Sequence, residues 1–468
     1  MKQMTPRRMA EECGGRLLTA PGYEDAAARE VVSIEIDSRK VQPGGMFAAM
    51  VGKRVNGNDY IPQVVQAGVT CVLTEMDIPL ETAPCQIKVK DAQWALGEIA
   101  RAYRMTLGTK VVGITGSVGK TSTKEMVASV LSQKFCTLRT PGNFNNELGL
   151  PLTIFGLNES HEAAVLEMGM NHFGEMHHLA QIARPNICLI TNIGECHLEY
   201  LGDRAGVLKA KSEIFDFLEG DETIILNGND DMLTRLSNVH GITPIFYGLP
   251  GKEEGGVELS VYADEIKSQG LSGISCRIHT PRGSFEACIP IPGEHMVMNA
   301  LAGTAVGLAC GLTIEQIKRG IESVSPVSGR LNQVKTARYG TIIDDCYNAN
   351  PMSMRASLQV LKDAGGRRVA ILGDMMELGE NEMEYHAQLG CFAADCHLDV
   401  LIGIGTRSRC LIDAAKECNP QQVCAHFDTA EDFLKVKDEY LTSEETVLVK
   451  ASHSMNFTAI IEALSQNE

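Results

Sequence analysis

The fold of this chain is decided by Gly113-Ile114-Thr115-Gly116-Ser117-Val118-Gly119-Lys120-Thr121. The stretch follows two apolar, β-branched residues, and the residues after it favour a helix. A glycine-rich turn between a strand and a helix presents backbone N–H groups and the positive end of the helix dipole to phosphate oxygens. Lys120 adds a point charge, and the Thr121 hydroxyl suits Mg²⁺. The stretch therefore predicts a site for nucleotide phosphates.

The spacing of this loop differs from that of an ordinary P-loop. The ordinary pattern has four residues between its first glycine and the Gly-Lys pair. Here Ile114 stands at the first-glycine position, and the nearest glycines are Gly113 and Gly116. The loop is an offset variant, and by itself it does not separate an ATPase from a kinase, a ligase or a GTP-dependent switch.

Composition limits the class of protein. A chain of 468 residues with 44% hydrophobic and 22% charged residues is long enough for about three soluble domains. A net charge of −17 disfavours nucleic acid and anionic lipid as partners. The sequence has no apolar run long enough to span a membrane and no secretory signal pattern, so we expect a cytoplasmic protein. Its fifteen cysteines are scattered without metal-site spacing, which predicts reduced and mostly buried thiols.

Three blocks with different patterns divide the chain at residues 1–107, 108–326 and 327–468. The first mixes short apolar runs with turns and predicts a small α/β domain that ends in a helix over 91–104. The second alternates strands with helices, which predicts a P-loop-type, mostly parallel sheet. The third alternates in the same way and predicts a doubly wound, dinucleotide-type domain, with one helix entered by Asn350-Pro351. The whole chain is thus predicted to be a three-domain α/β protein.

Particular elements follow from these patterns. In the second block, strands are expected at 111–114, 164–166, 187–191 and 223–226, and helices after the loop and over 204–218 and 295–309. The segment 251–292 has alternating apolar residues and should form a flanking antiparallel piece. In the third block, strands are expected at 341–343, 369–372, 400–402, 422–425 and 446–449.

Two polar residues follow strands of the predicted central sheet. Glu167 comes directly after the apolar run 163–166, and a carboxylate at the carboxyl end of a strand beside a P-loop is well placed to hold Mg²⁺. His197 follows the strand at 187–191 and is a candidate ligand for a second cation. Lys211 lies in a predicted helix, where a solvent-exposed lysine is the ordinary interpretation.

Several segments resemble those of the Mur ligases, which are ATP-dependent, amide-forming enzymes of peptidoglycan synthesis. That family's nucleotide loop has the same offset. The similarity runs from Asp37 to Lys450 and therefore covers nearly the whole chain. The other matching segments are 140–153 (TPGNFNNELGLPLT), 167–175 (EMGMNHFGE), 344–351 (DDCYNANP) and 372–379 (LGDMMELG).

The resemblance implies a specific activity, because the segments are most similar to the members that add a dipeptide. Such an enzyme joins D-alanyl-D-alanine to UDP-N-acetylmuramoyl-tripeptide through an acyl phosphate and releases ADP. The resemblance gives the first block the UDP-linked substrate and the second block ATP. It gives the third block the incoming dipeptide and part of ATP. It also implies a monomer that works in cytoplasmic precursor synthesis for the cell wall.

The resemblance further implies which residues bind ATP. Asn299 matches a position near the adenine, and Arg330 matches a phosphate contact made across the domain junction. Asp345 and Asn348 match positions that line the nucleotide from the third block. The loop residues implied to hold the phosphates are Gly116, Ser117, Val118, Gly119, Lys120, Thr121 and Ser122.

Metal and substrate residues are implied in the same way. Thr121 and Glu167 would hold one Mg²⁺, and His197 would hold a second together with a carbamylated lysine, which Lys211 matches best. A carbamate turns a cationic side chain into an anionic oxygen ligand. The residues implied to be catalytic are Lys120, Lys211 and His197, and those implied to touch substrate are Ser38 and Arg39 for the uridine diphosphate and Asn145 and Asn146 for the peptide.

The sequence departs from the family pattern at two places. Asn56-Gly57-Asn58-Asp59-Tyr60 stands where the family tends toward Asp-Gly-His-Asp/Glu-Phe, and Lys450-Ala451-Ser452-His453 stands where it has Lys-Gly-Ser-Arg. Histidine does not reproduce the two-pronged hydrogen bonding of arginine with a carboxylate. Two alternative functions stay open at this point. One is another amide ligase of the superfamily, such as a folylpolyglutamate synthase, and the other is a non-catalytic, nucleotide-binding switch.

Overall fold

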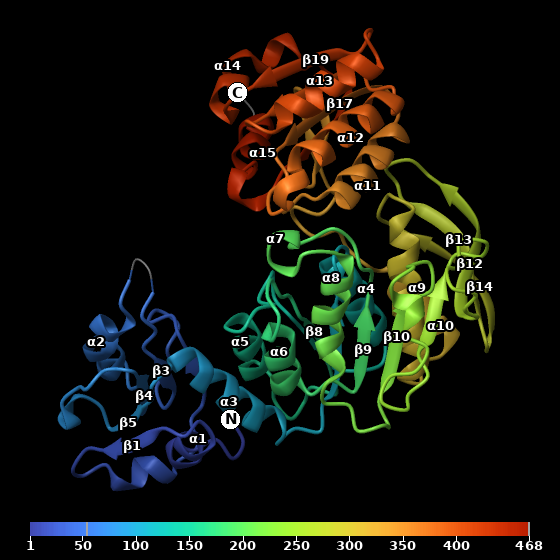
Figure 1. Ribbon diagram of the computed structural model, residues 1–468. Helices are drawn as coiled ribbons and strands as arrows, with labels where there is room; N and C mark the ends of the chain where they lie inside the picture. The colour runs from blue at the N-terminus through green and yellow to red at the C-terminus, as the bar shows by residue number, and fades with distance from the viewer. Residues whose placement is uncertain (53–54, 467–468) are drawn as a thin grey trace.

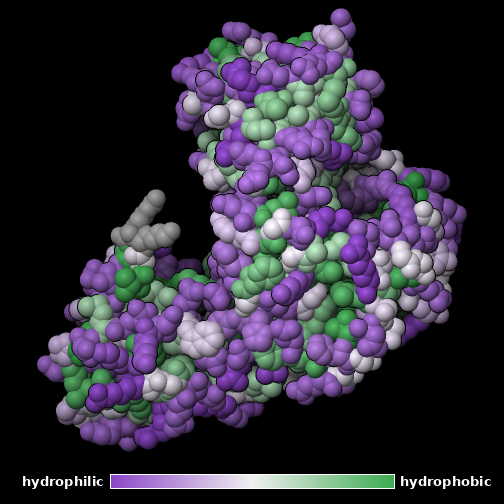
Figure 2. All heavy atoms as spheres, viewed as in Figure 1, coloured by the Kyte–Doolittle hydropathy of each residue, from purple (hydrophilic) through white to green (hydrophobic). Residues whose placement is uncertain are grey.

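The computed structural model describes residues 1–52 and 55–466, which form three α/β domains (Figure 1). The N-terminal domain, in blue, lies beside the lower part of the central domain, and the C-terminal domain, in orange and red, lies above it. The space-filling view shows an open notch between the N-terminal and C-terminal domains (Figure 2). Within the described residues, the helices are all too short or too polar to cross a membrane.

The N-terminal domain is built on a five-stranded sheet with the order β1-β5-β4-β3-β2. Strand β1 pairs with β5 in antiparallel orientation, and the other pairs are parallel. The strands are β1 (Arg16–Thr19), β2 (Ile34–Glu35), β3 (Met46–Ala48), β4 (Cys71–Thr74) and β5 (Cys85–Lys88), and the helices are α1 (Pro6–Glu12), α2 (Ile61–Gln66) and α3 (Ala92–Arg104).

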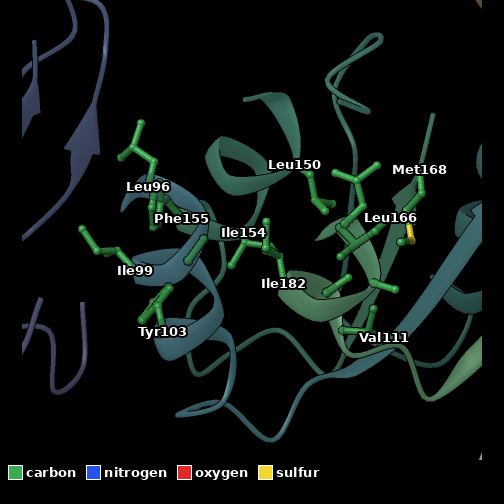
Figure 3. Close-up of a cluster of buried hydrophobic side chains, with 14 of the residues drawn as sticks. Leu96, Ile99, Tyr103, Val111, Leu150, Ile154, Phe155, Leu166, Met168 and Ile182 are labelled. Carbon is green, nitrogen blue, oxygen red and sulfur yellow. The ribbon is translucent and has the colours of Figure 1, made fainter. Parts of the chain in front are cut away.

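Helix α3 joins the N-terminal domain to the central one. It begins where the Asp91 side chain accepts a hydrogen bond from the Trp94 backbone N–H at 2.9 Å, which is a favourable helix cap. It packs against α5 (Gly149–Phe155) and α6 (Glu175–Ala183) of the central domain. Figure 3 shows its buried Ile99 pointing the other way, toward the N-terminal strands, while Ile154 and Ile182 lie on the side of the central domain. Each fully buried side chain of this size contributes about 1.5–3 kcal/mol. The predicted helix over 91–104 is therefore confirmed, and it fixes one domain against the next.

The central domain contains a nine-stranded sheet with the order β14-β13-β12-β11-β10-β9-β6-β8-β7. Pairs from β7 through β12 are parallel, and β12, β13 and β14 form the antiparallel piece predicted for 251–292. The strands are β6 (Lys110–Thr115), β7 (Thr137–Arg139), β8 (Ala163–Glu167), β9 (Ile187–Ile190), β10 (Thr223–Asn227), β11 (Ile245–Gly248), β12 (Leu259–Ser268), β13 (Ile274–Thr280) and β14 (Gly283–Ile289), and the remaining helices are α4 (Lys120–Leu131), α7 (Leu198–Leu201), α8 (Arg204–Ser212), α9 (His295–Ala309) and α10 (Ile314–Glu322).

The C-terminal domain has a six-stranded sheet with the order β15-β16-β20-β17-β18-β19. Only the β15–β16 pair is antiparallel among the described strands of this sheet. Asn350 caps the helix that begins at Pro351, as predicted. The strands are β15 (Asn332–Thr336), β16 (Gly340–Asp344), β17 (Arg367–Gly373), β18 (Val400–Ile404), β19 (Val423–Phe427) and β20 (Glu445–Lys450), and the helices are α11 (Pro351–Lys362), α12 (Glu382–Asp395), α13 (Ser408–Cys418), α14 (Ala430–Val436) and α15 (Thr458–Ser465).

Two expectations differ from the structure. The helix expected over 204–218 ends at Ser212, and a short 3-10 turn follows. In that turn, the Glu213 carboxylate accepts hydrogen bonds from the backbone N–H groups of Gly174 and His177 at the start of α6. The expectation of reduced cysteines is wrong for Cys391 and Cys418, which form a disulfide between α12 and α13. No spacing rule links residues 27 positions apart, and only helix packing brings their Cα atoms to 5.5 Å.

Candidate active site

The glycine-rich loop connects β6 to α4 at the carboxyl end of the central sheet. Strand β6 lies between β8 and β9, so its apolar residues are buried on both faces, as is usual for a central parallel strand. Gly119 has a φ of +81° and occupies the cap position before α4. Lys120 donates a hydrogen bond from Nζ to the Gly116 carbonyl at 2.7 Å. Burial lowers the pKa of Lys120, and the negative charge of Glu167 opposes that shift.

Residues after β9 fix the shape of the loop. The Thr191 hydroxyl and the Asn192 amide both donate to the Val118 carbonyl, at 2.6 and 3.0 Å. The Val118 N–H donates in turn to Asn192 Oδ1 at 2.9 Å. The Ser117 hydroxyl accepts a hydrogen bond from the Gly194 N–H at 2.9 Å. The phosphate loop is therefore held by side chains at the end of a second strand, and neither Thr191 nor Asn192 was predicted to be a site residue.

Close packing against Thr191 makes Gly116 sensitive to substitution. A Cβ atom at Gly116, where φ is +150°, would lie 1.9 Å from Thr191 Oγ1. We expect Gly116→Ala to push the loop away from Thr191, to destabilise the fold by about 1–3 kcal/mol and to weaken ADP binding. Gly108→Ala is the matched control, because a Cβ at Gly108 meets no described atom within 4 Å. Thermal unfolding and calorimetry with ADP measure both effects, and equal behaviour of the two variants would contradict this packing argument.

Glu167 ends strand β8 with a buried carboxylate that is 2% exposed. Its Oε1 accepts a hydrogen bond from Asn145 Nδ2 at 2.8 Å. Its Oε2 has no hydrogen-bond partner among the described residues, and the Lys124 ammonium lies 3.7 Å away. A buried carboxylate oxygen without a hydrogen bond is costly unless a cation or a donor engages it. Glu167 is therefore a suitable cation ligand at the carboxyl edge of the sheet.

The cation site would take few protein ligands. Within the described residues, no group of three or more His, Cys, Asp and Glu side chains is arranged to hold a metal ion. Thr121 lies in the first turn of α4 and is buried. Mg²⁺ is usually bound by one or two carboxylates, with substrate phosphates and water completing its shell. One carboxylate and one hydroxyl beside a phosphate loop fit that mode of binding.

Arg330 reaches the central domain from the start of the C-terminal one. Its Nη2 lies 3.5 Å from Thr121 Oγ1, and its guanidinium lies over the Tyr347 ring at 4.2 Å. The buried Nε of Arg330 has no hydrogen-bond partner in the described structure. The aromatic contact orients the guanidinium. The structure thus brings a second cationic group to the phosphate loop from across the domain junction.

A cavity of about 300 Å³ lies between α4, α9 and the C-terminal domain. Asn299 on α9 lines it and accepts a hydrogen bond from the Thr123 hydroxyl at 2.9 Å. Asp345 lines the opposite wall, where Lys450 donates to its Oδ2 at 2.6 Å. Its size and mixed apolar and polar lining suit a nucleoside. The other lining residues include Val118, Gly119, Ser122, Tyr247, Met296 and Arg330.

A second cavity, of about 320 Å³, lies on the other side of the loop. Ser117, Lys120 and His197 line it from the central domain, and Asn348 and His453 line it from the C-terminal domain. Asp345 and Asn348 were both expected to line the nucleotide. In the structure they lie at different cavities, because Asp345 lines the first and Asn348 lines the second. Both cavities are lined by residues of the glycine-rich loop, the first by Val118 and Gly119 and the second by Ser117 and Lys120.

His197 pairs with a carboxylate of the C-terminal domain. It has a φ of +53° at the start of α7, and its Nδ1 lies 2.9 Å from Glu377 Oε2. This contact lowers the pKa of Glu377. Glu377 also has a positive φ, of +61°, so both partners adopt an uncommon backbone conformation. Glu377 was not predicted to be a site residue, because no local pattern shows which distant residue will face a histidine.

Lys211 is buried in α8 with a side chain that makes no hydrogen bond or ion pair with a described residue. Burial lowers its pKa to about 8, and the nearby charge of Lys120 adds to the shift. A buried lysine without a carboxylate is unusual. The interpretation of Lys211 as an ordinary solvent-exposed lysine is therefore wrong.

The remaining predicted substrate residues lie in different surroundings. Arg39 is exposed and pairs with Asp37 at 2.7 Å, and neither it nor Ser38 lines the two cavities. Asn145 contacts Glu167, as described above. Asn146 accepts a hydrogen bond from the Gly149 N–H at 2.8 Å and so stabilises the start of α5. Roles for these four residues in substrate binding stay predictions.

Three segments of the chain match domain models of one protein family. Residues 114–307 match the Mur ligase middle domain, and residues 329–453 match the Mur ligase, glutamate ligase domain. Residues 30–104 match a model described as Mur ligase family, catalytic domain. The three matches together cover most of the chain and follow one another in the order of the three sheets.

Individual relatives match from end to end. UDP-N-acetylmuramoyl-tripeptide--D-alanyl-D-alanine ligase from Bacillus subtilis is 33% identical over 470 residues, which is 100% of this chain and 99% of the relative. A crystal structure of MurF from Acinetobacter baumannii superposes with a TM-score of 0.87 at 32% identity and covers 99% of both chains. A MurF ligase from Thermotoga maritima in complex with ADP has a TM-score of 0.79 at 25% identity, covering 92% of this chain and 97% of that one. With an offset phosphate loop, a carboxylate at the next strand end and an arginine that crosses the domain junction, this chain belongs to the Mur ligase family.

Proposed function

We propose that this protein is an ATP-dependent ligase that joins D-alanyl-D-alanine to UDP-N-acetylmuramoyl-tripeptide and releases ADP and phosphate. The observation that carries the proposal is its end-to-end similarity to ligases named for that reaction. The protein would act as a monomer in the cytoplasm during peptidoglycan precursor synthesis. Residues 1–107 would bind the UDP-linked substrate, 108–326 would bind ATP, and 327–468 would bind the dipeptide and part of ATP.

The first chemical step activates the peptide carboxylate. A carboxylate oxygen attacks the γ-phosphorus of ATP, the bond from that phosphorus to the β,γ-bridging oxygen breaks, and ADP leaves. Lys120 and Arg330 would offset the repulsion between the two anionic reactants, because both bring positive charge to the loop. Asn299 would hold the adenine end in the cavity beside α9. Catalysis in this step is mainly positioning and electrostatic stabilisation.

The second step forms the amide bond. The free amine of the dipeptide attacks the acyl carbon and loses a proton, and the tetrahedral intermediate expels phosphate. The cavity lined by Lys120, Asn348 and His453 supports a location for this step, because it reaches the loop and is shared by two domains. His453 lies 5.5 Å from the Tyr347 ring, centroid to centroid. It stands where the family tends to have an arginine, so recognition of the dipeptide carboxylate at this corner must differ.

Mg²⁺ fits the residues present. Thr121 and Glu167 would hold one ion, and the Glu167 oxygen that lacks a hydrogen bond supports this assignment. Bound Mg²⁺ supplies positive charge that neutralises the phosphates. A second ion would be held by His197 and a carbamylated Lys211. The pairing of Nδ1 with Glu377 leaves Nε2 of His197 for a cation, an arrangement common among histidine ligands.

Carbamylation of Lys211 is supported by its burial. A neutral Nζ attacks the carbon of CO₂, an N–C bond forms, and one proton leaves to solvent, so that an anionic carbamate replaces a cation. A pKa of about 8 makes the neutral amine accessible near neutral pH, whereas an ordinary lysine is almost wholly charged there. The anionic product would also be compatible with a buried site beside Lys120 once a cation is bound.

We expect Lys211→Ala to lower ligation by about 100-fold or more, since second-sphere and ligand changes at metal sites have effects of this size. Added formate or acetate should restore part of the activity, because a small carboxylate can replace the carbamate. Lys209→Ala is the control, because Lys209 is exposed on the same helix. In the unaltered protein, carbon-13 NMR with labelled CO₂ should show a carbamate signal that grows as pH rises through about 8. If Lys211→Ala kept full activity and the unaltered protein gave no carbamate signal, Lys211 would not be carbamylated.

The proposed activity is tested with purified protein, ATP, Mg²⁺ and two tripeptide substrates, one with lysine and one with diaminopimelate at the third position. Mass spectrometry should detect a UDP-linked pentapeptide, and ADP should form only when both substrates are present. A non-catalytic switch would hydrolyse ATP without them. Another amide ligase of the family would form ADP with a different amino acid and not with D-alanyl-D-alanine.

A further inference from the structure

A fully buried lysine lies one helical turn beyond the phosphate-binding lysine. Lys124 belongs to α4 and is 0% exposed. Its ammonium donates hydrogen bonds to the Thr140 carbonyl at 2.8 Å and to the Gly142 carbonyl at 3.1 Å. Both carbonyls belong to the segment 140–146, which follows β7. A lysine is almost never fully buried unless its charge is compensated, so the surroundings of Lys124 need an explanation.

Two carboxylates compensate the charge of Lys124. Glu125 Oε1 lies 3.2 Å from its Nζ, and Glu167 Oε2 lies 3.7 Å away. The Glu167 atom is the one that lacks a hydrogen bond. One buried ammonium therefore faces the candidate metal ligand on one side and the backbone of the 140–146 segment on the other.

The 140–146 segment is also bound directly to the end of β8. Asn145 donates to Glu167 Oε1 at 2.8 Å, and the Glu167 N–H donates to the Thr140 hydroxyl at 2.9 Å. The Gly169 N–H donates to the Asn145 carbonyl at 2.8 Å. The segment and the carboxylate thus form one hydrogen-bonded unit, and Lys124 attaches that unit to the helix that begins at the phosphate loop.

We propose that Lys124 is a positioning residue that couples the Mg²⁺ carboxylate Glu167 to the segment 140–146, which carries the two residues predicted to bind the peptide, Asn145 and Asn146. This inference rests on the proposed function. The ammonium sets the position of the segment through two carbonyls and holds Glu167 in place through its charge. Removing the charge leaves a buried carboxylate uncompensated, which shifts its position. Disturbance at Lys124 therefore reaches metal binding and tripeptide binding together.

The test uses Lys124→Gln and Lys124→Arg. Glutamine keeps N–H donors for the two carbonyls and removes the charge, whereas arginine keeps the charge. Lys134→Gln is the matched control, because Lys134 lies just beyond the same helix and donates to the Gly311 carbonyl at an exposed site. Circular dichroism and thermal unfolding establish whether each variant is folded. Calorimetry measures ADP binding with Mg²⁺ and with EDTA, and steady-state kinetics separate KM for tripeptide from kcat.

We expect Lys124→Gln to weaken ADP binding in Mg²⁺ by about tenfold, as outer-sphere changes at metal sites do, and to raise KM for tripeptide by a similar factor. ADP binding in EDTA should stay within about twofold, the range of changes that touch no ligand. Lys124→Arg should recover part of the Mg²⁺-dependent binding. The control should match the unaltered protein throughout.

Three results would overturn the coupling. If a folded Lys124→Gln protein had unchanged Mg²⁺-dependent ADP binding and an unchanged KM for tripeptide, Lys124 would couple neither site. A change in only one of the two would assign Lys124 to that site alone. Loss of the fold in both variants would make Lys124 a structural residue. The ADP measurements need no turnover, so absence of ligase activity in the unaltered protein would contradict the proposed function separately.

Discussion

Lys120→Ala is expected to lower ADP formation by about 100- to 1,000-fold, the effect of removing a charge that stabilises a phosphoryl-transfer transition state. Lys120 lies at the start of α4, within the glycine-rich loop, and lines a cavity together with His197 and Asn348. The fold should survive, because its Nζ bonds only loop carbonyls in the described structure. Initial rates of ADP release and a thermal unfolding curve measure the two effects.

Lys110→Ala provides the control for this prediction. Lys110 begins the same strand, β6, but is exposed at the opposite end of the sheet. Its replacement should leave the rate within about twofold, as surface changes usually do. Near-normal turnover of Lys120→Ala would exclude the mechanism in which this loop promotes phosphoryl transfer, whereas equal losses in both variants would point to damage of the sheet.

Glu167→Gln is expected to lower ADP formation by a comparable factor, about 100-fold or more, and to raise the Mg²⁺ concentration needed for half-maximal rate. Glutamine has nearly the same shape and can still accept the hydrogen bond from Asn145 at Oε1. It removes the negative charge that faces Lys124 and would face a cation. A titration of rate against Mg²⁺ separates weaker metal binding from a slower chemical step.

Glu162→Gln is the matched control for Glu167→Gln. Glu162 is exposed just before the same strand, β8, and accepts a hydrogen bond from the Cys136 N–H at 3.1 Å. It should leave the Mg²⁺ dependence unaltered. If Glu167→Gln had an unchanged Mg²⁺ requirement and an unchanged rate, Glu167 would not be a metal ligand, and its buried oxygen would need another partner.

Much of the central sheet was predictable because its strands are short apolar runs buried on both faces. The strands expected at 111–114 and 164–166 appear as β6 and β8, each extended by one residue at both ends. Parallel strands end at one edge, so a polar residue directly after such a run, as at Glu167, is a reliable site candidate. Short strands without a continuous apolar run, such as β7 and β2, gave no comparable signal.

Contacts between distant segments account for what could not be predicted from the sequence. No local pattern around Lys124 indicates its complete burial, because that burial depends on contacts with the 140–146 segment. Thr191 and Asn192 follow strand β9 directly, and Glu167 is the last residue of β8, yet Thr191 and Asn192 hold Val118 in place. Asp345 and Asn348 are close in sequence but face different cavities, because the chain turns between them before α11 begins.

The central claim is that the phosphate loop uses ATP to activate a carboxylate, and isotope transfer tests it most directly. The tripeptide is prepared with oxygen-18 in its terminal carboxylate and is incubated with the protein, ATP, Mg²⁺ and D-alanyl-D-alanine. An acyl phosphate requires that one labelled oxygen leave with the phosphate, so the released phosphate should carry a single oxygen-18 atom for each amide bond formed. Released phosphate without oxygen-18 would contradict this mechanism. It would mean that the labelled oxygens stay on the peptide and that water hydrolyses ATP.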